Sequence, residues 1–188
     1  MSGGYYFLVA SLPHLSLRAA PPLTTGQFLR RCAAQVSATH YRILAEVERF
    51  QAQPTGTGLA LLDRWHEREH ALRNALAVVR AQRLGVAAAP YLRNFRQDPS
   101  LAEIAQRLLM LDSPLAADEE LDRLRWRFLE ELAFGHYFDL ETLVIYRLKL
   151  HLLERRARFN PTVGAALLDQ MLAQGAERGR DAFARFGT

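Results

Sequence analysis

The spacing of apolar residues constrains the fold of this chain more than any other feature. Through long segments, separated by proline and glycine, apolar side chains recur at the helical period. No segment alternates apolar and polar residues over the length of a sheet strand. With 188 residues and 49% hydrophobic content, the chain is long enough for one ordinary globular domain. The sequence therefore predicts an all-α fold, a single-domain bundle of about seven helices over residues 1–188.

Capping residues, proline and glycine set the expected helix ends. Thr24 or Thr25 can cap the first helix, Gly85 is a typical stop for the third, and Asn160-Pro161 is typical of the start of the last. The short apolar segment 5–12 fits either a strand or a buried turn of helix. The first expected helix has apolar positions that include Phe28, Leu29, Cys32 and Val36. The others are expected at about 37–51, 59–84, 100–111, 115–134, 138–158 and 160–186.

Cysteine content and apolar run lengths indicate the compartment. The single cysteine, Cys32, cannot form an internal disulfide, and the first residues lack the pattern of a secretory signal. We therefore expect a reducing, cytoplasmic compartment. The longest apolar runs, such as 5–10 and 143–146, are far shorter than the roughly twenty residues that span a bilayer. Any contact with a membrane is expected to be peripheral.

Charge is mixed along most of the chain, with 24 basic and 20 acidic residues and a net charge of +4. Such a mixture is typical of a solvated surface, and no nucleic-acid-binding motif occurs, so we expect no nucleic acid partner. The basic excess is greatest in one cluster, which fits phosphates, anionic lipid or an acidic protein: Arg147, Lys149, Arg155, Arg156 and Arg158. Arg155, Arg156 and Arg158 are the predicted interface residues.

One motif suggests metal chemistry, because His66-Glu67-Arg68-Glu69-His70 matches the His-Glu-x-x-His pattern of zinc hydrolases. In those enzymes the two histidines bind zinc, the glutamate acts as the base on the metal-bound water, and a third ligand comes from elsewhere. No third histidine follows at the metzincin spacing. Glu103 is a distant alternative ligand that nothing singles out.

A helical wheel places the motif unfavourably for catalysis. The buried stripe of its helix comprises Leu61, Trp65, Leu72, Leu76 and Val79. His66 and His70 lie at one edge of this stripe, at the boundary between core and solvent, while Glu67 points toward water. Glu69 and Arg73, four residues apart, are expected to form a surface ion pair. A zinc hydrolase that uses His66, Glu67 and His70 is therefore the least favoured of three hypotheses, and we predict no bound zinc.

Other signs of catalysis are missing from the sequence. It contains neither a glycine-rich phosphate loop nor a Gly-x-Ser-x-Gly elbow, and its serines are few and isolated. We therefore expect no enzymatic activity and no cofactor.

Two helical segments have similar sequences, RNALAVVRAQRLG from Arg73 and LETLVIYRLKLHL from Leu140. At one shared offset of 67 residues, Asn74 aligns with Glu141, Arg80 with Arg147 and Gln82 with Lys149. This similarity indicates either a weak internal repeat, with units around 59–85 and 138–158, or the spacing that any two amphipathic helices share. Arg147 lies on a face of a nearly all-apolar helix, so we expect it to be paired with a carboxylate or with helix-end carbonyls.

The same two segments resemble a known family, the all-helical adaptor subunit that sits between the central stalk and the rotor ring of V-type (vacuolar/archaeal-type) ATP synthases. The similar residues are Arg73-Asn74-Ala75-Leu76 with Arg80-Ala81-Gln82, and Asp139-Leu140-Glu141 with Arg147-Leu148-Lys149. In the family pattern an acidic or polar residue precedes Asn-Leu, and Arg-x-Lys follows. Gln82 replaces the lysine, Glu141 replaces the asparagine, and the chain is far shorter than a full adaptor subunit of that family.

The start of the chain carries a closer resemblance. Tyr5-Tyr6-Phe7-Leu8-Val9-Ala10-Ser11-Leu12-Pro13, followed by Pro21-Pro22-Leu23 and Phe28-Leu29, resembles a short bacterial family of uncharacterised function encoded within V-type ATP synthase operons. The resemblance implies a non-catalytic subunit or accessory component in proton or sodium transport, an adaptor that binds the central stalk and the rotor ring. The second hypothesis is a helical scaffold with another partner.

Overall fold

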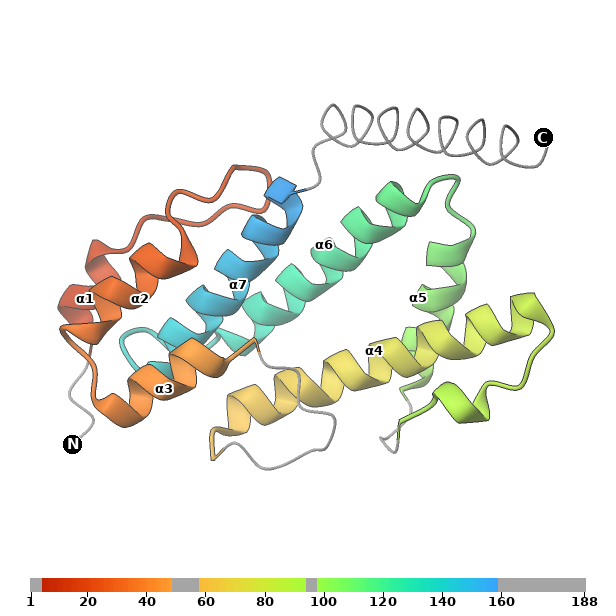
Figure 1. Cartoon of the computed structure of the whole chain (residues 1–188), viewed down its shortest axis with the longest axis horizontal. Helices are drawn as coiled ribbons and strands as arrows, with labels where there is room; N and C mark the ends of the chain where they lie inside the picture. The colour runs from red at the N-terminus through yellow and green to blue at the C-terminus, as the bar shows by residue number, and fades with distance from the viewer. Residues whose placement is uncertain (1–4, 49–57, 94–97, 159–188) are drawn as a thin grey trace, which may run out of the picture. The chain divides into compact units, whose positions relative to one another are not determined.

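The computed structural model describes residues 5–48, 58–93 and 98–158. In these ranges the chain forms α-helices and one 3-10 helix and no strand, which confirms the predicted all-α class (Figure 1). The elements in chain order are α1 (Tyr6–Ser11), α2 (Thr25–Ala33), α3 (Ala38–Glu46), α4 (Ala60–Leu84), η1 (Ala89–Tyr91), α5 (Pro99–Leu109), α6 (Pro114–Leu132) and α7 (Leu140–Arg158).

Helix starts are fixed by side-chain caps that are local in sequence. Thr24 accepts a hydrogen bond from the backbone N–H of Gln27, and the Gln27 side chain accepts one from the N–H of Thr24, which completes a capping box. Ser37, Asp98 and Ser113 cap α3, α5 and α6 in the simpler way, with one side-chain oxygen accepting a backbone N–H. These caps explain why the sequence predicts the starts of α2, α3, α5 and α6 within a residue or two.

Several boundaries differ from the prediction. Segment 5–12, which fitted a strand or a helix, forms the helix α1, and α3 ends at Glu46 instead of near residue 51. The 3-10 helix η1 was not predicted. Gly85 ends α4 as expected, with a left-handed backbone (φ 67°) that glycine adopts without strain. The predicted helix 160–186 lies outside the described residues.

The chain divides into two compact units, Met1–Leu153 and Glu154–Thr188. Of the second unit the structure describes residues 154–158, which end α7. The expectation of one domain over 1–188 therefore stays a prediction. None of the described helices is both long enough and apolar enough to cross a membrane.

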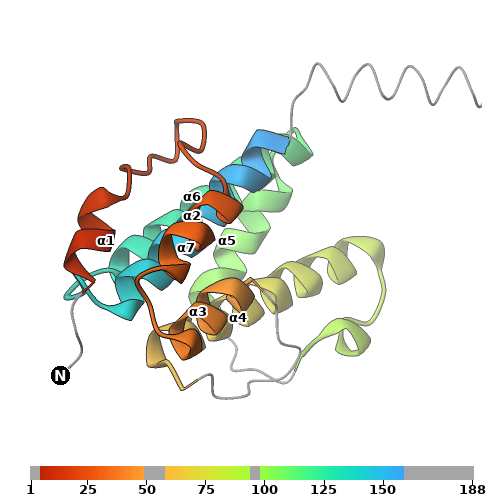
Figure 2. The same ribbon diagram turned by 60° about the vertical axis from the view of Figure 1, so that its left-hand side comes forward.

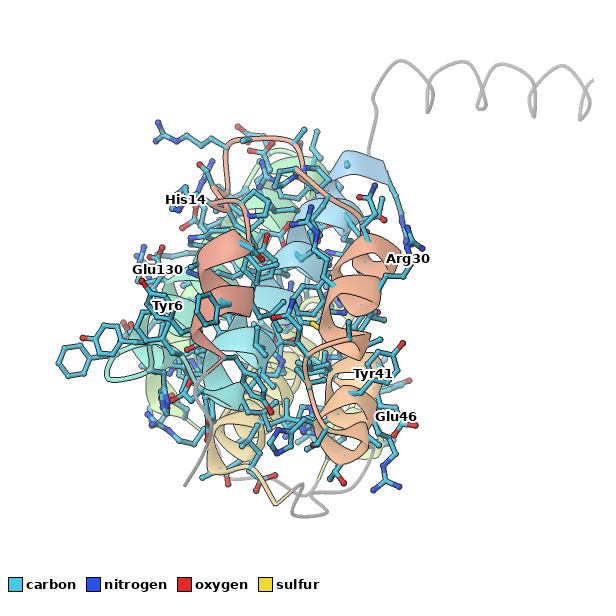
Figure 3. All side chains as sticks on the ribbon, turned by 90° about the vertical axis from the view of Figure 1, so that its left-hand side faces the viewer. Tyr6, His14, Arg30, Tyr41, Glu46 and Glu130 are labelled. Atoms are coloured by element: carbon cyan, nitrogen blue, oxygen red, sulfur yellow. The ribbon has the colours of Figure 1, made fainter. Side chains whose placement is uncertain are left out.

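The larger of two hydrophobic cores surrounds α7, which lies between α6 on one side and α1 and α2 on the other (Figures 1 and 2). Figure 3 looks onto the outer layer of this core, where α1 and the α2–α3 pair lie in front of α7. The buried side chains of this core come from every α-helix except α5. Those that are fully buried include Leu8, Phe28, Cys32, Leu44, Leu129, Leu143 and Leu150. The α7 helix is therefore the central element of the unit, as predicted for segment 138–158.

The smaller core joins α4, α5 and α6 (Figure 1). Its buried side chains are Ala71, Leu72, Leu76, Leu101, Ala105, Leu108 and Leu121. Because the first half of α4 contributes Leu61, Leu62 and Trp65 to the larger core, α4 takes part in both cores. The predicted burial of Trp65, Leu72, Leu76, Leu140 and Val144 is confirmed, and Val79 is half-buried against the smaller core.

Candidate functional site

The His-Glu-x-x-His residues of α4 do not face one common cleft. Glu67 is exposed and lines a surface groove of about 440 Å³, together with Arg64, Arg68 and residues of α5 and α6. His70 is buried, with 1% of its surface exposed, so its predicted position at the core boundary is wrong. Among the described residues, neither histidine belongs to a cluster of three potential metal ligands. Glu103, the alternative ligand, is exposed on α5.

The predicted ion pair of Glu69 with Arg73 is present, but its expected location on the surface is wrong for Glu69. Glu69 is buried, and its carboxylate accepts two hydrogen bonds from Arg125 of α6, from Nε at 2.8 Å and from Nη2 at 3.2 Å. Arg73 lies at the edge of this pair, with Nε 4.0 Å from the carboxylate. Asp122, also buried, lies 3.6 Å from Nη1 of Arg125. The wheel missed this cluster because α6 covers a second face of α4.

The polar residues that the repeat aligns differ in burial and in contacts between α4 and α7. Asn74 is buried, and its amide both donates to the carbonyl of Arg93 (2.8 Å) and accepts from the N–H of Arg93 (3.0 Å). This double contact fixes the chain just after η1 against α4. Arg80 and Gln82 are exposed, whereas Arg147, which aligns with Arg80, is buried. Burial therefore does not follow the repeat at this position.

Arg147 is paired as predicted. Its guanidinium forms an ion pair with Glu48, in the turn that follows α3, and the same carboxylate oxygen lies 2.9 Å from Nδ1 of His151. Arg147 is 2% exposed, while about a third of the Glu48 side chain is exposed. The pair therefore ties the end of α3 to the middle of α7 through a carboxylate that water reaches.

The expectation of a five-residue basic surface is wrong for two of its members. Arg147 is internal, and Lys149 is largely covered, with its ammonium 3.7 Å from Glu130 and over the ring of Trp126. Burial lowers the pKa of Lys149, and the nearby Glu130 opposes this shift. Arg155 and Arg156 are half-buried and Arg158 is exposed, so their role as an interface stays a prediction.

His136, Asp139 and Glu141 form the one described cluster with the composition of a metal site, with candidate ligand atoms within 4.8 Å of one another. The Asp139 carboxylate is already engaged: one oxygen accepts the N–H and hydroxyl of Thr142, and the other lies 2.6 Å from Nδ1 of His136. Burial raises the pKa of Asp139, but the hydrogen bonds from His136 and Thr142 outweigh burial and hold this pKa below its usual value. The positive end of the α7 dipole also disfavours a cation here. The geometry is that of a helix cap.

Sequence reasoning missed an exposed surface of five aromatic rings, which we call the aromatic end. It comprises Tyr6, Phe7, Phe134, Tyr137 and Phe138, of which Phe134 is 90% exposed and Phe7 82%. The N–H of Tyr5 donates to the carbonyl of Phe138 (2.7 Å), which brings α1 to the α6–α7 loop. The ring of Tyr6 then lies 4.8 Å from that of Phe138 and 5.5 Å from that of Phe7, between centroids. The aromatic cluster 134–138 around Gly135 was a signal for this surface.

A second set of exposed apolar side chains, which we call the aliphatic end, lies where α4 ends and where α5 turns into α6. Arg83 of α4 donates to the carbonyl of Leu109 (3.1 Å) and so holds the ends of α4 and α5 together. The exposed residues are Leu84, Val86, Met110, Leu111 and Leu115. Loop 133–139 follows α6 and turn 110–113 precedes it, so the two ends are separated by the length of α6 (Figure 1). Nineteen residues correspond to about 28 Å of helix.

Comparison with known proteins gives one match. Residues 93–174 match the model of a family described as "Protein of unknown function (DUF2764)". The matched range includes α5, α6 and α7, and with them Arg125, Arg147 and the 134–138 loop. No curated protein and no solved structure matches the chain. The family match itself carries no link to the adaptor subunit of V-type ATP synthases.

Proposed function

We propose that this protein is a non-catalytic adaptor that binds two partners, and that its place is in a bacterial V-type ATP synthase, between the central stalk and the rotor ring. The observation that carries the adaptor role is the pair of exposed apolar ends at opposite ends of α6. Exposed apolar side chains that gather in one region of a folded unit are typical of surfaces that bind other proteins. Two such surfaces on one unit suit a molecule that joins two others.

The interior supports a mechanical role for the unit between its two ends. The α6 helix contributes Trp126, Leu129 and Leu132 to the larger core and Leu121 to the smaller one. The Glu69–Arg125 contact ties α6 to α4 as well. Because closely packed interiors deform little, force applied at one end would reach the other without loss of structure.

The choice of complex rests on the residues that resemble V-type ATP synthase components, in segments 5–13, 73–82 and 139–149. ATP chemistry in such a complex would belong to partner subunits, and contact with the membrane would be peripheral, through the complex. The isolated chain should then neither bind nor hydrolyse ATP. It should also contain no stoichiometric zinc, because Glu67 faces solvent while His70 is buried.

Capture from native membranes tests this function. A tagged full-length chain should co-purify with central-stalk and rotor-ring subunits, identified by mass spectrometry. A variant with Phe134→Ser and Tyr137→Ser should lose one set of subunits, and Met110→Ser with Leu111→Ser should lose the other, because each variant alters one apolar end. Glu103→Gln, an exposed change on α5, is the matched control.

The outcomes separate the proposal from its alternative. Capture of unrelated proteins through the same two ends would favour a helical scaffold with other partners. Capture that neither pair of substitutions changes would exclude both ends as binding surfaces. Reversal of Arg155, Arg156 and Arg158 to Glu tests the predicted basic interface separately, and should slow assembly, mainly at low salt.

A further inference from the structure

The aromatic end is acidic in a chain that is basic overall. The two segments that contain its rings, residues 5–17 and 128–146, have no lysine or arginine, whereas the whole chain has a net charge of +4. The same segments contain four carboxylates, Glu130, Glu131, Asp139 and Glu141. Glu131 is exposed in the last turn of α6, and Glu141 is half-exposed in the first turn of α7, on either side of the aromatic loop. The exposed rings therefore have carboxylates along the chain on both sides.

Part of this charge is neutralised within the fold. Glu130 accepts a hydrogen bond from Trp126 Nε1 (2.7 Å) and lies 3.7 Å from Lys149. Asp139 is occupied as the cap of α7. Glu131 and Glu141 form no ion pair with another described residue in the structure. Figure 3 shows Glu130 on the same side of the molecule as Tyr6 of α1.

The aliphatic end has the opposite character. Residues 80–93 contain Arg80, Arg83 and Arg93 and no acidic residue, and residues 107–115 contain one arginine and one aspartate. The two ends are therefore distinguished by charge as well as by ring content. Charges at the two ends select partners by repulsion as well as by attraction, because like charges that meet at an interface raise the free energy of binding.

We propose that the aromatic end binds a basic amphipathic helix of a partner protein, with apolar side chains packed among the five rings and lysine or arginine beside Glu131 and Glu141. This proposal rests on the proposed adaptor function and names the chemistry of one of its two partners. Helix ends and loops form the surface, and the described residues offer no strand edge to which an extended peptide could add, which favours a helical ligand over an added strand. Exposed aromatic faces also attract cations, arginine above all.

The same charges argue against the other occupants. An anionic lipid surface and an acidic protein would both be repelled by the uncompensated carboxylates. A second copy of the chain would have to present its basic aliphatic end to the aromatic end, which predicts open-ended association that increases with concentration. Oligomerisation is therefore measured alongside binding.

The direct test uses two synthetic helical peptides of about 18 residues, or five turns, that share a leucine face. One carries lysine and arginine on its polar face, and the other carries glutamate at the same positions. Fluorescence anisotropy with the full-length chain should show at least about tenfold tighter binding of the basic peptide, a preference that weakens as salt is added. Vesicles that contain anionic lipid should not bind at the same protein concentration.

Variants assign the binding to this surface. Phe134→Ser with Tyr137→Ser should weaken binding of the basic peptide by about tenfold or more, because the apolar anchors are lost. Glu131→Lys with Glu141→Lys should reverse the preference in favour of the acidic peptide. Glu67→Lys with Glu103→Lys makes the same change of charge at exposed positions of α4 and α5, and should leave the preference for the basic peptide in place. Circular dichroism and thermal melting establish that each variant is folded.

The peptide experiment can overturn the proposal or assign the surface to another partner. Equal binding of the two peptides, or loss of the preference in the Glu67 and Glu103 control, would overturn the proposal. Concentration-dependent oligomers that disappear in the Phe134 and Tyr137 variant would assign the surface to a second copy instead. Failure of this proposal is distinct from failure of the adaptor function. If the chain captures stalk and ring subunits through the aromatic end but has no preference for the basic peptide, the function stands and the partner chemistry is wrong.

Discussion

Arg125 and Arg147 are both largely buried, but their carboxylate partners come from different parts of the fold. Arg125 lies between α6 and α4, where two helices supply its partners: Glu69 in a two-pronged contact and Asp122 at 3.6 Å. Arg147 lies in the larger core, where a turn supplies its carboxylate, Glu48, which also contacts His151. The Glu69 side chain is 8% exposed and that of Glu48 is 32% exposed.

This difference separates a contact that joins two helices from one that holds the turn after α3. The Glu69–Arg125 pair is the more closed of the two, with 8% and 12% of the side chains exposed, and it is fixed by the packing of α4 and α6. Losing one partner therefore leaves a largely buried charge. The Glu48–Arg147 pair is open to water on the Glu48 side. Nε and Nη1 of Arg147 have no hydrogen-bond partner among the described residues. We infer that the α3 turn is the less firmly held of the two regions.

Removing Glu69 should have the largest effect on stability. Glu69→Ala leaves Arg125 largely buried with Asp122 as its nearest remaining carboxylate, and should lower the free energy of unfolding by about 4 kcal/mol, measured by urea denaturation. Glu67→Ala, an exposed change two residues away, should alter it by less than about 0.5 kcal/mol. A loss below about 1 kcal/mol for Glu69→Ala would show that the closed pair is not what joins α4 to α6.

Glu48→Ala should have a smaller effect, although Arg147 is the more deeply buried arginine. Water can reach the position that the exposed Glu48 carboxylate vacates, so we expect a loss of about 2 kcal/mol in the free energy of unfolding. In hydrogen exchange, the amides of α3 should lose protection while those of α4 and α6 keep theirs. Equal losses for Glu48→Ala and Glu69→Ala would remove the distinction between the two sites.

Replacing the arginines themselves should also distinguish the two sites. Arg147→Met removes an incompletely bonded charge from an apolar helix and leaves Glu48 partly solvated, so the free energy of unfolding should change by no more than about 1 kcal/mol. Arg125→Met leaves two buried carboxylates, Glu69 and Asp122, and should cost more than Arg147→Met in the same urea experiment. The reverse order would contradict the assignment of Arg125 as the main link between α4 and α6.

The helices were predictable because their signals are local. Thr24, Ser37, Gly85 and Ser113 act on backbone groups within a few residues, so sequence alone marks those ends. The need for a partner at Arg147 was also predictable, because an unpaired charge in an apolar helix is costly. Its identity was not, since Glu48 is remote in sequence and lies in a turn.

The buried pair on α4 was missed for a related reason. Helical periodicity finds one apolar stripe, whereas α4 is buried on more than one face, by α5 on one side and by α6 on another. Glu69 therefore looked like a surface residue with Arg73 as its natural partner, although Arg125 lies 56 residues away. The aromatic end was missed because alternation and spacing describe what a segment buries. They do not indicate which rings stay exposed after the helices pack.

The smallest expected effect is electrostatic and concerns His66, one turn before His70 on α4. Burial lowers the pKa of His66 from its ordinary value near 6.5, while Asp63 and Glu69 raise it in part. Because the folded pKa is below the unfolded one, the unfolded chain takes up the proton first as the pH falls through 6.5. Stability should therefore fall between pH 6.5 and the folded pKa, and level off below it.

This titration distinguishes the two arginine sites without unfolding the protein. Glu69→Gln removes a charge that raises the pKa of His66, so this pKa should fall further, as followed by NMR of the ring protons. Glu48→Gln changes a carboxylate that does not act on His66, and should leave its titration unchanged. His66→Gln assigns the resonance, because its ring signals disappear. A common shift in both carboxylate variants would mean that the two charged sites influence each other through the fold, and that the α3 turn is not independent of the link between α4 and α6.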